Sequence, residues 1–312
     1  MTTVAMPAAE PTGRLRSQVG LIWLALSVVY VVWGSTYLAI RFTIESMPPL
    51  LSAGSRFLVA GILMTTVLII RGGFRTMRIT RRQLVTTALI GSLLLVGGNG
   101  GVVVGERWVA SGVAALLVAA VPLWLVIARV MTGDRPSRPT VVGVLIGLVG
   151  LAILAVPGGH NGANTTVVGV LVIIFATLSW ATGSFLSGRV GLPANPFVAA
   201  AYETLAGGVV LSVLGLSTGE FGDLDLGSIT GKSWLALGYL VVFGSMLAFT
   251  SYIWLLHHAP ISLVATYAYV NPVIAVLLGA LLAAEPLTAA VLLGGATIVA
   301  GVVLVVSKER AH

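Results

Sequence analysis

Long apolar runs separated by short polar links dominate the chain. Each run is close to the twenty or so residues that a helix needs to cross a bilayer, and most links contain Pro, Gly or charge, which end helices. This pattern predicts an all-α polytopic membrane protein with ten transmembrane helices. The runs lie at about 20–42, 48–70, 83–105, 111–131, 139–157, 166–188, 196–217, 233–256, 261–283 and 288–307.

The two ends of the chain are polar. The first residues are rich in Pro and Ala, and the apolar run after them is longer than the hydrophobic part of a signal peptide. We therefore expect residues 1–18 to be a disordered cytoplasmic tail and residues 308–312 a second short tail.

The charges set an orientation. Only 9% of the 312 residues are charged, against about 25% in a soluble domain. Cytoplasmic links of membrane proteins are enriched in Lys and Arg, and alternate links here hold thirteen such residues against three. This bias predicts that both termini are cytoplasmic in a bacterial-type plasma (inner) membrane. The thirteen are Arg14, Arg16, Arg71, Arg75, Arg78, Arg81, Arg82, Arg129, Arg135, Arg138, Arg189, Lys308 and Arg310; the three are Arg41, Arg107 and Lys232.

The positions of the positive charges also indicate what the protein contacts. The net charge of +7 arises from the cytoplasmic links, above all "RGGFRTMRITRR" at 71–82, so it indicates the lipid bilayer and argues against nucleic acid. The chain has no Cys, its four His have no zinc-ligand spacing, and no Walker A pattern occurs. We expect no metal, no cofactor and no ATP-driven step.

The chain repeats itself. Pro49 matches Pro196, Arg56 matches Glu203 and Gly61 matches Gly208, each 147 residues apart, while Pro122 matches Pro272 at 150. These matches predict two five-helix copies, at 19–157 and 158–307. Five is odd, so the second copy crosses the membrane in the opposite sense, and inverted repeats are a common architecture of secondary transporters.

Three stretches carry a resemblance to a known family: "VYVVWGSTYLAIRFTIESMPPLLSAGSRFLVAGILM" (29–64), "NGGVVVGERWVASGVAALLVAAVPLW" (99–124) and "TYAYVNPVIAVLLGALLAAEPLT" (266–288). They resemble EamA-type permeases of the drug/metabolite transporter superfamily. The resemblance implies a ten-helix carrier, usually an exporter of amino acids or other small metabolites. It also implies a central cavity lined by helices one, three, four, six, eight and nine. Here those helices carry Trp33, Asn99, Pro122, Trp180, Tyr252 and Asn271.

Polar and aromatic residues within these helices are the candidates for substrate binding. Two prolines near the middle of their runs, Pro122 and Pro272, free backbone carbonyls, which suits either hinges or packing kinks. Trp33 and Trp180 suit either the cavity or the lipid interface. The candidate substrate-binding residues are Trp33, Tyr37, Asn99, Trp124, Trp180, Ser184, Tyr252, Tyr267 and Asn271.

Two charged residues lie well inside the runs, several residues from either end. Ionisable groups within a membrane are functional candidates by default, so Glu203 is a candidate for proton coupling and Arg56 for coupling or substrate contact. The alternative is that each is a buried structural partner. A direct pair between them is disfavoured, because inversion puts them in opposite leaflets. Glu285 precedes Pro286 and suits the start of a helix.

These features predict a secondary active transporter, an exporter of amino acids or other small metabolites or drugs, that works by alternating access around a midplane cavity. A facilitative channel or a lipid flippase is the alternative. A membrane-embedded lipid-modifying enzyme is disfavoured because the carboxylates are scattered. Glycine pairs such as Gly143 and Gly147 are weak indications of association, so monomer and homodimer both stay open.

Overall fold

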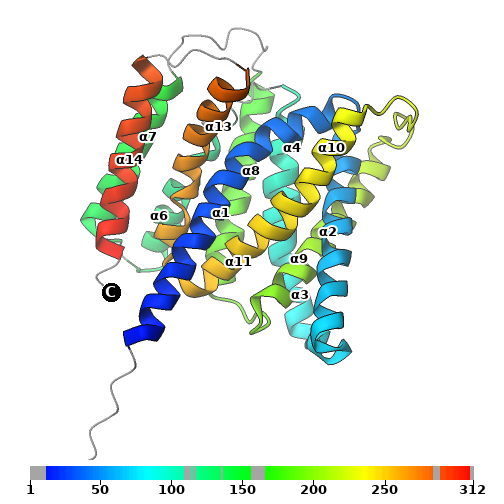
Figure 1. The fold of residues 1–312 in the computed structure, drawn as a ribbon, viewed down its shortest axis with the longest axis horizontal. Coiled ribbons are helices and arrows are strands. Elements are labelled where there is room, and N and C mark those ends of the chain that lie inside the picture. The colour runs from blue at the N-terminus through cyan, green and yellow to red at the C-terminus, as the bar shows by residue number, and fades with distance from the viewer. Residues whose placement is uncertain are drawn as a thin grey trace, which may run out of the picture.

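A computed structural model describes residues 12–108, 114, 117–134, 136–155, 166–283 and 289–309, and every regular element in these ranges is helical (Figure 1). The helices form an elongated bundle in which α1 begins and α14 ends at the same end. The elements of the first half are α1 (Thr12–Ile44), α2 (Pro49–Gly72), η1 (Phe74–Met77), α3 (Arg81–Gly91), η2 (Ser92–Gly100), α4 (Gly101–Gly105), α6 (Val121–Met131) and α7 (Arg138–Ala155). Those of the second half are α8 (Val167–Ser187), α9 (Pro196–Ser217), α10 (Gly231–Tyr239), η3 (Leu240–Ala248), α11 (Phe249–His258), α12 (Ile261–Val264), α13 (Tyr267–Ala283) and α14 (Ala289–Glu309).

Among the described residues, six helical stretches are long and apolar enough to cross a membrane. Shorter apolar helices occupy the other four predicted runs, so the membrane class is confirmed while the number of ten crossings stays a prediction. The six stretches are Gln18–Ile44, Pro49–Gly72, Arg81–Gly105, Val167–Ser187, Pro196–Ser217 and Gly231–His258; the shorter helices are Val121–Met131, Arg138–Gly150, Ile261–Ile274 and Leu292–Val305.

Helix α1 is longer than its apolar run, because it begins at Thr12, inside the segment predicted to be a disordered tail. The first eleven residues lie outside the described residues, as do Arg135, Glu285 and the last three residues. The helix-start role predicted for Glu285 is therefore not described.

Side-chain caps fix several helix starts. Thr80 accepts a hydrogen bond from the backbone N–H of Gln83, whose side-chain oxygen accepts one from the Thr80 N–H, so α3 begins with a capping box. At the starts of α8 and α10, the side chains of Thr166 and Thr230 accept from the backbone N–H groups of Gly169 and Ser233. Asn195 caps α9, whose first turn carries Pro196, a position where a missing N–H costs nothing.

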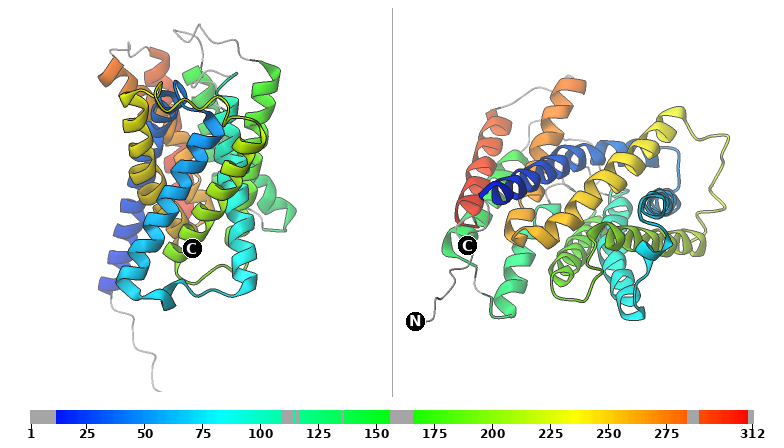
Figure 2. Two further views of the ribbon diagram at one scale, coloured as in Figure 1. Left: turned by 90° about the vertical axis from the view of Figure 1, so that its right-hand side faces the viewer. Right: turned by 60° about the horizontal axis from the view of Figure 1, so that its bottom comes forward.

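The two halves pack with a pairwise symmetry. Helix α2 packs against its repeat partner α9 at one edge of the bundle, and α7 packs against its partner α14 at the other (Figures 1 and 2). Helix α1 contacts α13 and the α10–η3–α11 helix, while its partner α8 contacts α6 and the η2 helix. Each contact of one repeat thus has a counterpart in the other, and α1 and α8 run in opposite directions (Figure 1).

Glycines allow the two edge pairs to approach closely. A Cβ placed on Gly208 of α9 would lie 2.6 Å from the backbone nitrogen of Leu58 on α2, and one on Gly143 of α7 would lie 2.8 Å from the carbonyl oxygen of Gly301 on α14. Gly147 faces the ring of Tyr269. This glycine pair therefore packs within the chain, and monomer and homodimer both stay open.

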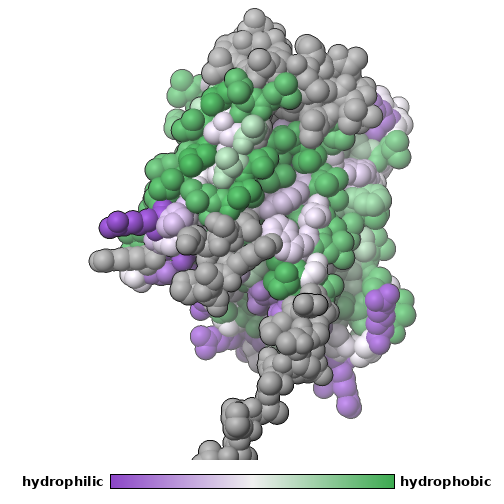
Figure 3. Space-filling model, turned by 60° about the vertical axis from the view of Figure 1, so that its left-hand side comes forward, coloured by the Kyte–Doolittle hydropathy of each residue, from purple (hydrophilic) through white to green (hydrophobic). Residues whose placement is uncertain are grey.

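The outer surface is apolar, as a lipid-facing surface must be. Many large hydrophobic side chains are exposed, among them Leu24, Ile62, Phe175 and Val213. Figure 3 shows apolar surface over the middle of the bundle, with most hydrophilic side chains toward the end where α1 begins. The buried core instead lies where the two repeats meet.

Candidate functional site

A small cavity lies between the repeats. Its volume is about 70 Å³, well below the roughly 300 Å³ of a small ligand pocket, so the cavity must widen to admit a ligand of that size. It takes its walls from both repeats, through α1, α2, η2, α8, η3 and α13. Of the predicted residues, those that line it are Trp33, Tyr37, Arg56, Asn99, Trp180, Tyr267 and Asn271.

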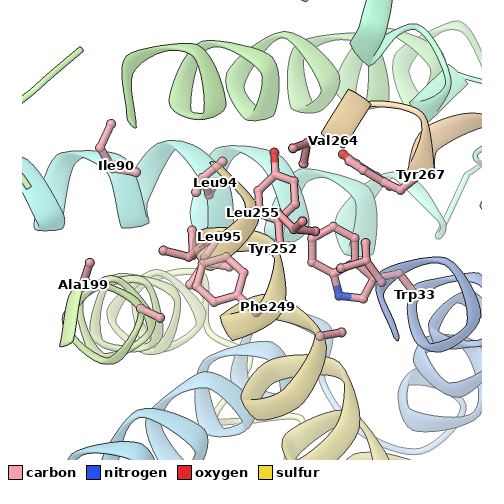
Figure 4. Close-up of a cluster of buried hydrophobic side chains, with 14 of the residues drawn as sticks. Trp33, Ile90, Leu94, Leu95, Ala199, Phe249, Tyr252, Leu255, Val264 and Tyr267 are labelled. Atoms are coloured by element: carbon pink, nitrogen blue, oxygen red, sulfur yellow. The ribbon is translucent and has the colours of Figure 1, made fainter. Parts of the chain in front are cut away.

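Four aromatic rings cluster on one side of the cavity. Trp33 and Trp180, which occupy equivalent positions in the two repeats, meet edge to face with ring centroids 5.4 Å apart. The rings of Tyr252 and Tyr267 lie 5.0 Å from that of Trp33, and Figure 4 shows these three side chains converging from α11, α13 and α1. Trp33 is only 8% exposed, so it belongs to the interior and not to an interfacial belt.

Hydrogen bonds fix these rings in place. The Trp33 indole donates to the carbonyl oxygen of Gly244 at 3.3 Å, and the Trp180 indole donates to the Tyr252 hydroxyl at 3.1 Å. The Ser184 and Tyr252 hydroxyl oxygens lie 2.5 Å apart. Ser184 and Tyr252 are both buried and lie behind the cavity wall. The structure thus places them as supports of the tryptophans, not as wall residues.

Trp124 was also predicted to face the substrate, and it too lies outside the wall. Its indole donates at 3.1 Å to Thr177 Oγ1, and Thr177 lines the cavity. Trp124 therefore contacts the wall from behind, across the packed pair α6 and α8.

Asn99 lies in a π-helical segment. The stretch "GGNGG" at 97–101 overlaps this segment: η2 is π-helical over Ser92–Gly100. Such segments are rare and often occur at functional sites. Asn99 lines the cavity, and its Oδ1 is buried with no hydrogen-bond partner among the described residues. Gly98 lets Trp180 approach, because a Cβ there would lie 2.7 Å from the indole ring.

A second π-helical segment, η3 (Leu240–Ala248), lies 148 residues after η2 in the equivalent helix of the other repeat. It supplies Gly244 to the cavity wall. The sequence analysis missed it, because the glycine cluster that marks η2 is absent from η3. The repeat offset is the signal that would have found it.

Asn271 joins two helices as well as lining the cavity. With its amide oriented so that the nitrogen faces two carbonyls, Asn271 donates to the backbone oxygens of Tyr267 and Tyr30, both at 3.1 Å. The Tyr30 hydroxyl also lies 2.5 Å from Thr266 Oγ1. Asn271 therefore ties α13 to α1, a structural role that the sequence analysis did not assign.

The helix breaks differ from those predicted. Pro272 lies inside α13, and the chain turns at Ala265 and Thr266, between α12 and α13. Pro122 lies in the first turn of α6, where proline is tolerated. The two prolines thus occupy different helical contexts: Pro122 directly follows a turn at Ala119 and Ala120, whereas Pro272 lies six residues after one. Their role as hinges stays a prediction.

The two charges inside the helices have different surroundings. Arg56 is 4% exposed, lines the cavity and donates from Nε to Ser245 Oγ at 2.7 Å. Glu203 is fully buried away from the cavity, and neither of its carboxylate oxygens has a hydrogen-bond partner among the described residues. The π-helical segments are 148 residues apart, so the repeat counterpart of Ser245 is Gly97. Glycine has no hydroxyl, so Glu203 lacks the partner that Ser245 provides for Arg56.

Arg56 and Glu203 do not pair. Gly61 packs against Leu205 and Gly54 against Ser212, so Glu203 is level with a point on α2 about seven residues from Arg56, or about 10 Å along the helix. This separation agrees with the expectation from the inverted repeat.

One buried carboxyl was missed. Glu106 follows α4, and its Oε1 is buried without a hydrogen-bond partner among the described residues. It comes one residue after the predicted end of the third run, so the sequence placed it in a link. No group of three or more His, Cys, Asp or Glu suited to a metal occurs in the described part of the chain.

Contacts between the two repeats occur at both ends of the bundle. At the end away from the termini, Arg107 pairs with Glu220 at 3.4 Å, and Lys232 pairs with Glu45. The Ser46 hydroxyl donates to that of Ser233 at 2.7 Å. At the other end, Thr86 Oγ1 donates to the carbonyl oxygen of Gly191 at 2.9 Å. Both ends are therefore held by bonds that join the first repeat to the second.

Comparison with known proteins identifies close relatives. The model of the EamA-like transporter family matches residues 18–156 and again 167–307. The uncharacterized inner membrane transporter YedA of Escherichia coli (strain K12) is 43% identical over 90% of this chain and 89% of its own length. A probable terminal-alkyne amino-acid exporter of Streptantibioticus cattleyicolor is 27% identical over 91% of this chain and 92% of its own. One protein of known crystal structure superposes with a TM-score of 0.74 at 23% identity, covering 92% of this chain and 97% of its own, so it shares the fold.

Proposed function

Because this chain belongs to the EamA-like transporter family, we propose that it is a secondary active transporter that exports amino acids or other small metabolites by alternating access. The observation that carries this proposal is the small cavity lined by both repeats, with contacts between the repeats at each end of the bundle. A carrier opens such a cavity to each side in turn, whereas a channel needs a continuous path.

The substrate class and the direction rest on two supports. The cavity joins aromatic faces to an amide and a guanidinium, which suits a small amphipathic molecule. A relative covering 91% of this chain is named a probable exporter of an amino acid. We extend that direction to this chain as part of the proposal.

The energy source that we propose is a proton gradient. The chain has no Walker A pattern for ATP hydrolysis. Glu203 supplies a buried carboxyl without a hydrogen-bond partner among the described residues. Such a group costs free energy when charged, so it suits a site that binds and releases a proton as its surroundings change.

The proposal also includes the number and orientation of the helices in the membrane. Ten helices form two inverted repeats of five, with both termini in the cytoplasm of a bacterial-type plasma membrane. The excess of Lys and Arg in alternate links supports this orientation, and the relative YedA is an inner membrane transporter.

Counterflow in proteoliposomes tests the proposal. Purified protein is reconstituted with an unlabelled substrate inside, and uptake of the labelled substrate is followed over a panel of amino acids and cationic drugs. A carrier gives saturable exchange with a transient overshoot. Flux without saturation indicates a channel, and movement of labelled lipid between leaflets indicates a flippase. Absence of saturable exchange for every compound would contradict the proposal.

A further inference from the structure

Arg56 is a buried cation in the cavity wall that has no anionic partner. Its side chain is 4% exposed, and no carboxylate of the described residues forms an ion pair with it. Nε donates to Ser245 Oγ at 2.7 Å, and the guanidinium carbon lies 4.7 Å from the centre of the Phe57 ring. The terminal nitrogens make no hydrogen bond to described residues, while the residue itself lines the cavity. Its strongest donors are therefore available to whatever enters.

An unpaired guanidinium is a costly feature inside a membrane protein. Removal of its water is repaid only when an anion and good hydrogen bonds replace that water, and charged residues kept at this depth mark substrate or ion pathways. A purely structural arginine would be paired. The fixed fork of guanidinium N–H groups matches the two oxygens of a carboxylate. The missing partner of Arg56 therefore has the chemistry of a carboxylate brought by the substrate.

The remaining wall defines the rest of that molecule. Asn99 Oδ1 is buried without a donor among the described residues, so it suits an amine or another N–H group. The rings of Trp33 and Trp180 present apolar faces, which suit an aliphatic or aromatic body and attract an ammonium group. A small molecule with a carboxylate, an amino group and an apolar body satisfies all three.

We propose that Arg56 is the residue that recognises the substrate's carboxylate, and that it restricts the cavity to small amphipathic acids at the expense of neutral or cationic analogues. This proposal rests on the proposed transport function and adds a specificity that the fold alone does not fix. Ser245 positions the guanidinium through Nε, and the binding energy comes from its terminal nitrogens.

Matched acids and amides test this role directly. Purified protein is titrated with leucine, phenylalanine, tryptophan and the carboxamide of each, with binding followed as the rise in melting temperature in detergent. The same six compounds are then compared in counterflow. Hydrogen bonds to charged groups are worth roughly ten- to a hundredfold in affinity, so we expect at least one acid to bind more tightly than its amide by that factor.

Three variants locate the effect. In Arg56→Gln the affinity for the acid falls to that for the amide. In Arg56→Lys it falls part of the way, because an ammonium keeps the charge and loses the fork. Arg71→Gln, which removes an exposed charge from the far end of the same helix, leaves the preference unchanged. Arg56→Lys keeps the test valid if Arg56→Gln does not fold.

The outcomes separate the two proposals. If wild-type protein binds no acid more tightly than its amide, or if Arg56→Gln keeps the preference, the role of Arg56 is overturned. Saturable counterflow of amides and acids alike would overturn that role while leaving the carrier intact. If no compound shows saturable counterflow, the carrier proposal fails, and the binding titration still decides whether Arg56 recognises the carboxylate.

Discussion

At the scale of single residues, the two repeats differ most where they carry charge. Arg56 and Glu203 occupy equivalent positions, yet Arg56 reaches the cavity and Ser245, whereas the Glu203 carboxyl finds no partner among the described residues. The duplicated fold thus gives one position a cation at the binding site and the other a buried carboxyl away from it. The proposed substrate recognition and the proposed proton coupling therefore fall to different residues.

Glu203→Gln tests the coupling role. The amide has the shape of the carboxyl, and no ion pair with a described residue depends on the charge, so we expect the variant to fold and to keep substrate counterflow. Uptake driven by a pH gradient should fall at least about tenfold, since the amide cannot exchange a proton. Proteoliposomes with and without an imposed pH gradient measure both activities.

The matched control is Asp223→Asn, which removes an exposed carboxylate in the link between α9 and α10. We expect it to leave the response to the pH gradient unchanged. Full pH-driven uptake by Glu203→Gln would exclude Glu203 as the coupling group.

Single residues were the least predictable part of the site. Resemblance and position within apolar runs placed five residues at the cavity, and these line it: Trp33, Trp180, Asn99, Tyr267 and Asn271. Ser184, Tyr252 and Trp124 share those properties but support the wall from behind, because helix rotation is set by packing that one sequence does not show. Glu106 was missed because helix ends are uncertain by a few residues.

At the scale of helices, close packing of α2 on α9 holds the two repeats together. The position for a Cβ on Gly208 lies against the backbone of Leu58, so a methyl group there forces the helices apart. We expect Gly208→Ala to lower the free energy of unfolding by about 1–3 kcal/mol, the usual cost of overpacking. Thermal unfolding in detergent, followed by size-exclusion chromatography of heated samples, measures it.

Gly238→Ala is the control for this prediction. Gly238 lies in α10 with no atom within 4 Å of the added Cβ, and alanine favours a helix over glycine by up to about 1 kcal/mol. We expect unchanged or slightly raised stability. Equal losses in both variants would show that glycine content, and not the contact between α2 and α9, controls stability.

The helices themselves were largely predictable, because hydrophobic length identifies a membrane helix directly. Their irregularities were not. In the π-helical η2 and η3, backbone carbonyls accept hydrogen bonds from neighbouring helices: Leu93 from the Ser179 hydroxyl and Gly244 from the Trp33 indole. Proline content alone located the break near Pro272 and missed its true position.

At the scale of the whole molecule, orientation in the membrane follows from the charged links. The thirteen-to-three excess of Lys and Arg predicts a cytoplasmic C-terminus. A green fluorescent protein fused after His312 should fluoresce, and alkaline phosphatase fused there should be inactive. A phosphatase inserted after Asp223, in the link between α9 and α10, should be active. The reverse pattern would invert the proposed orientation.

Alternating access requires that the two ends of the bundle open in turn. The chain contains no cysteine, so pairs can be introduced without background. In the double variant Ser46→Cys and Ser233→Cys, the replaced hydroxyls lie 2.7 Å apart, and a disulfide there should hold the end away from the termini shut. At the opposite end, Thr86→Cys and Gly191→Cys can be joined by a short bifunctional thiol reagent.

We expect each cross-link alone to abolish counterflow and a reductant to restore it, while single-cysteine variants stay active. Exchange requires the same cavity to face both sides, so closing either end stops the whole cycle even though the other end still opens. A carrier in which the first repeat stays fixed to the second at one end would tolerate that cross-link. Persistent exchange under complete cross-linking at either end would therefore rule out the separation of α1 from α10, or of α3 from α8, as the motion that admits substrate.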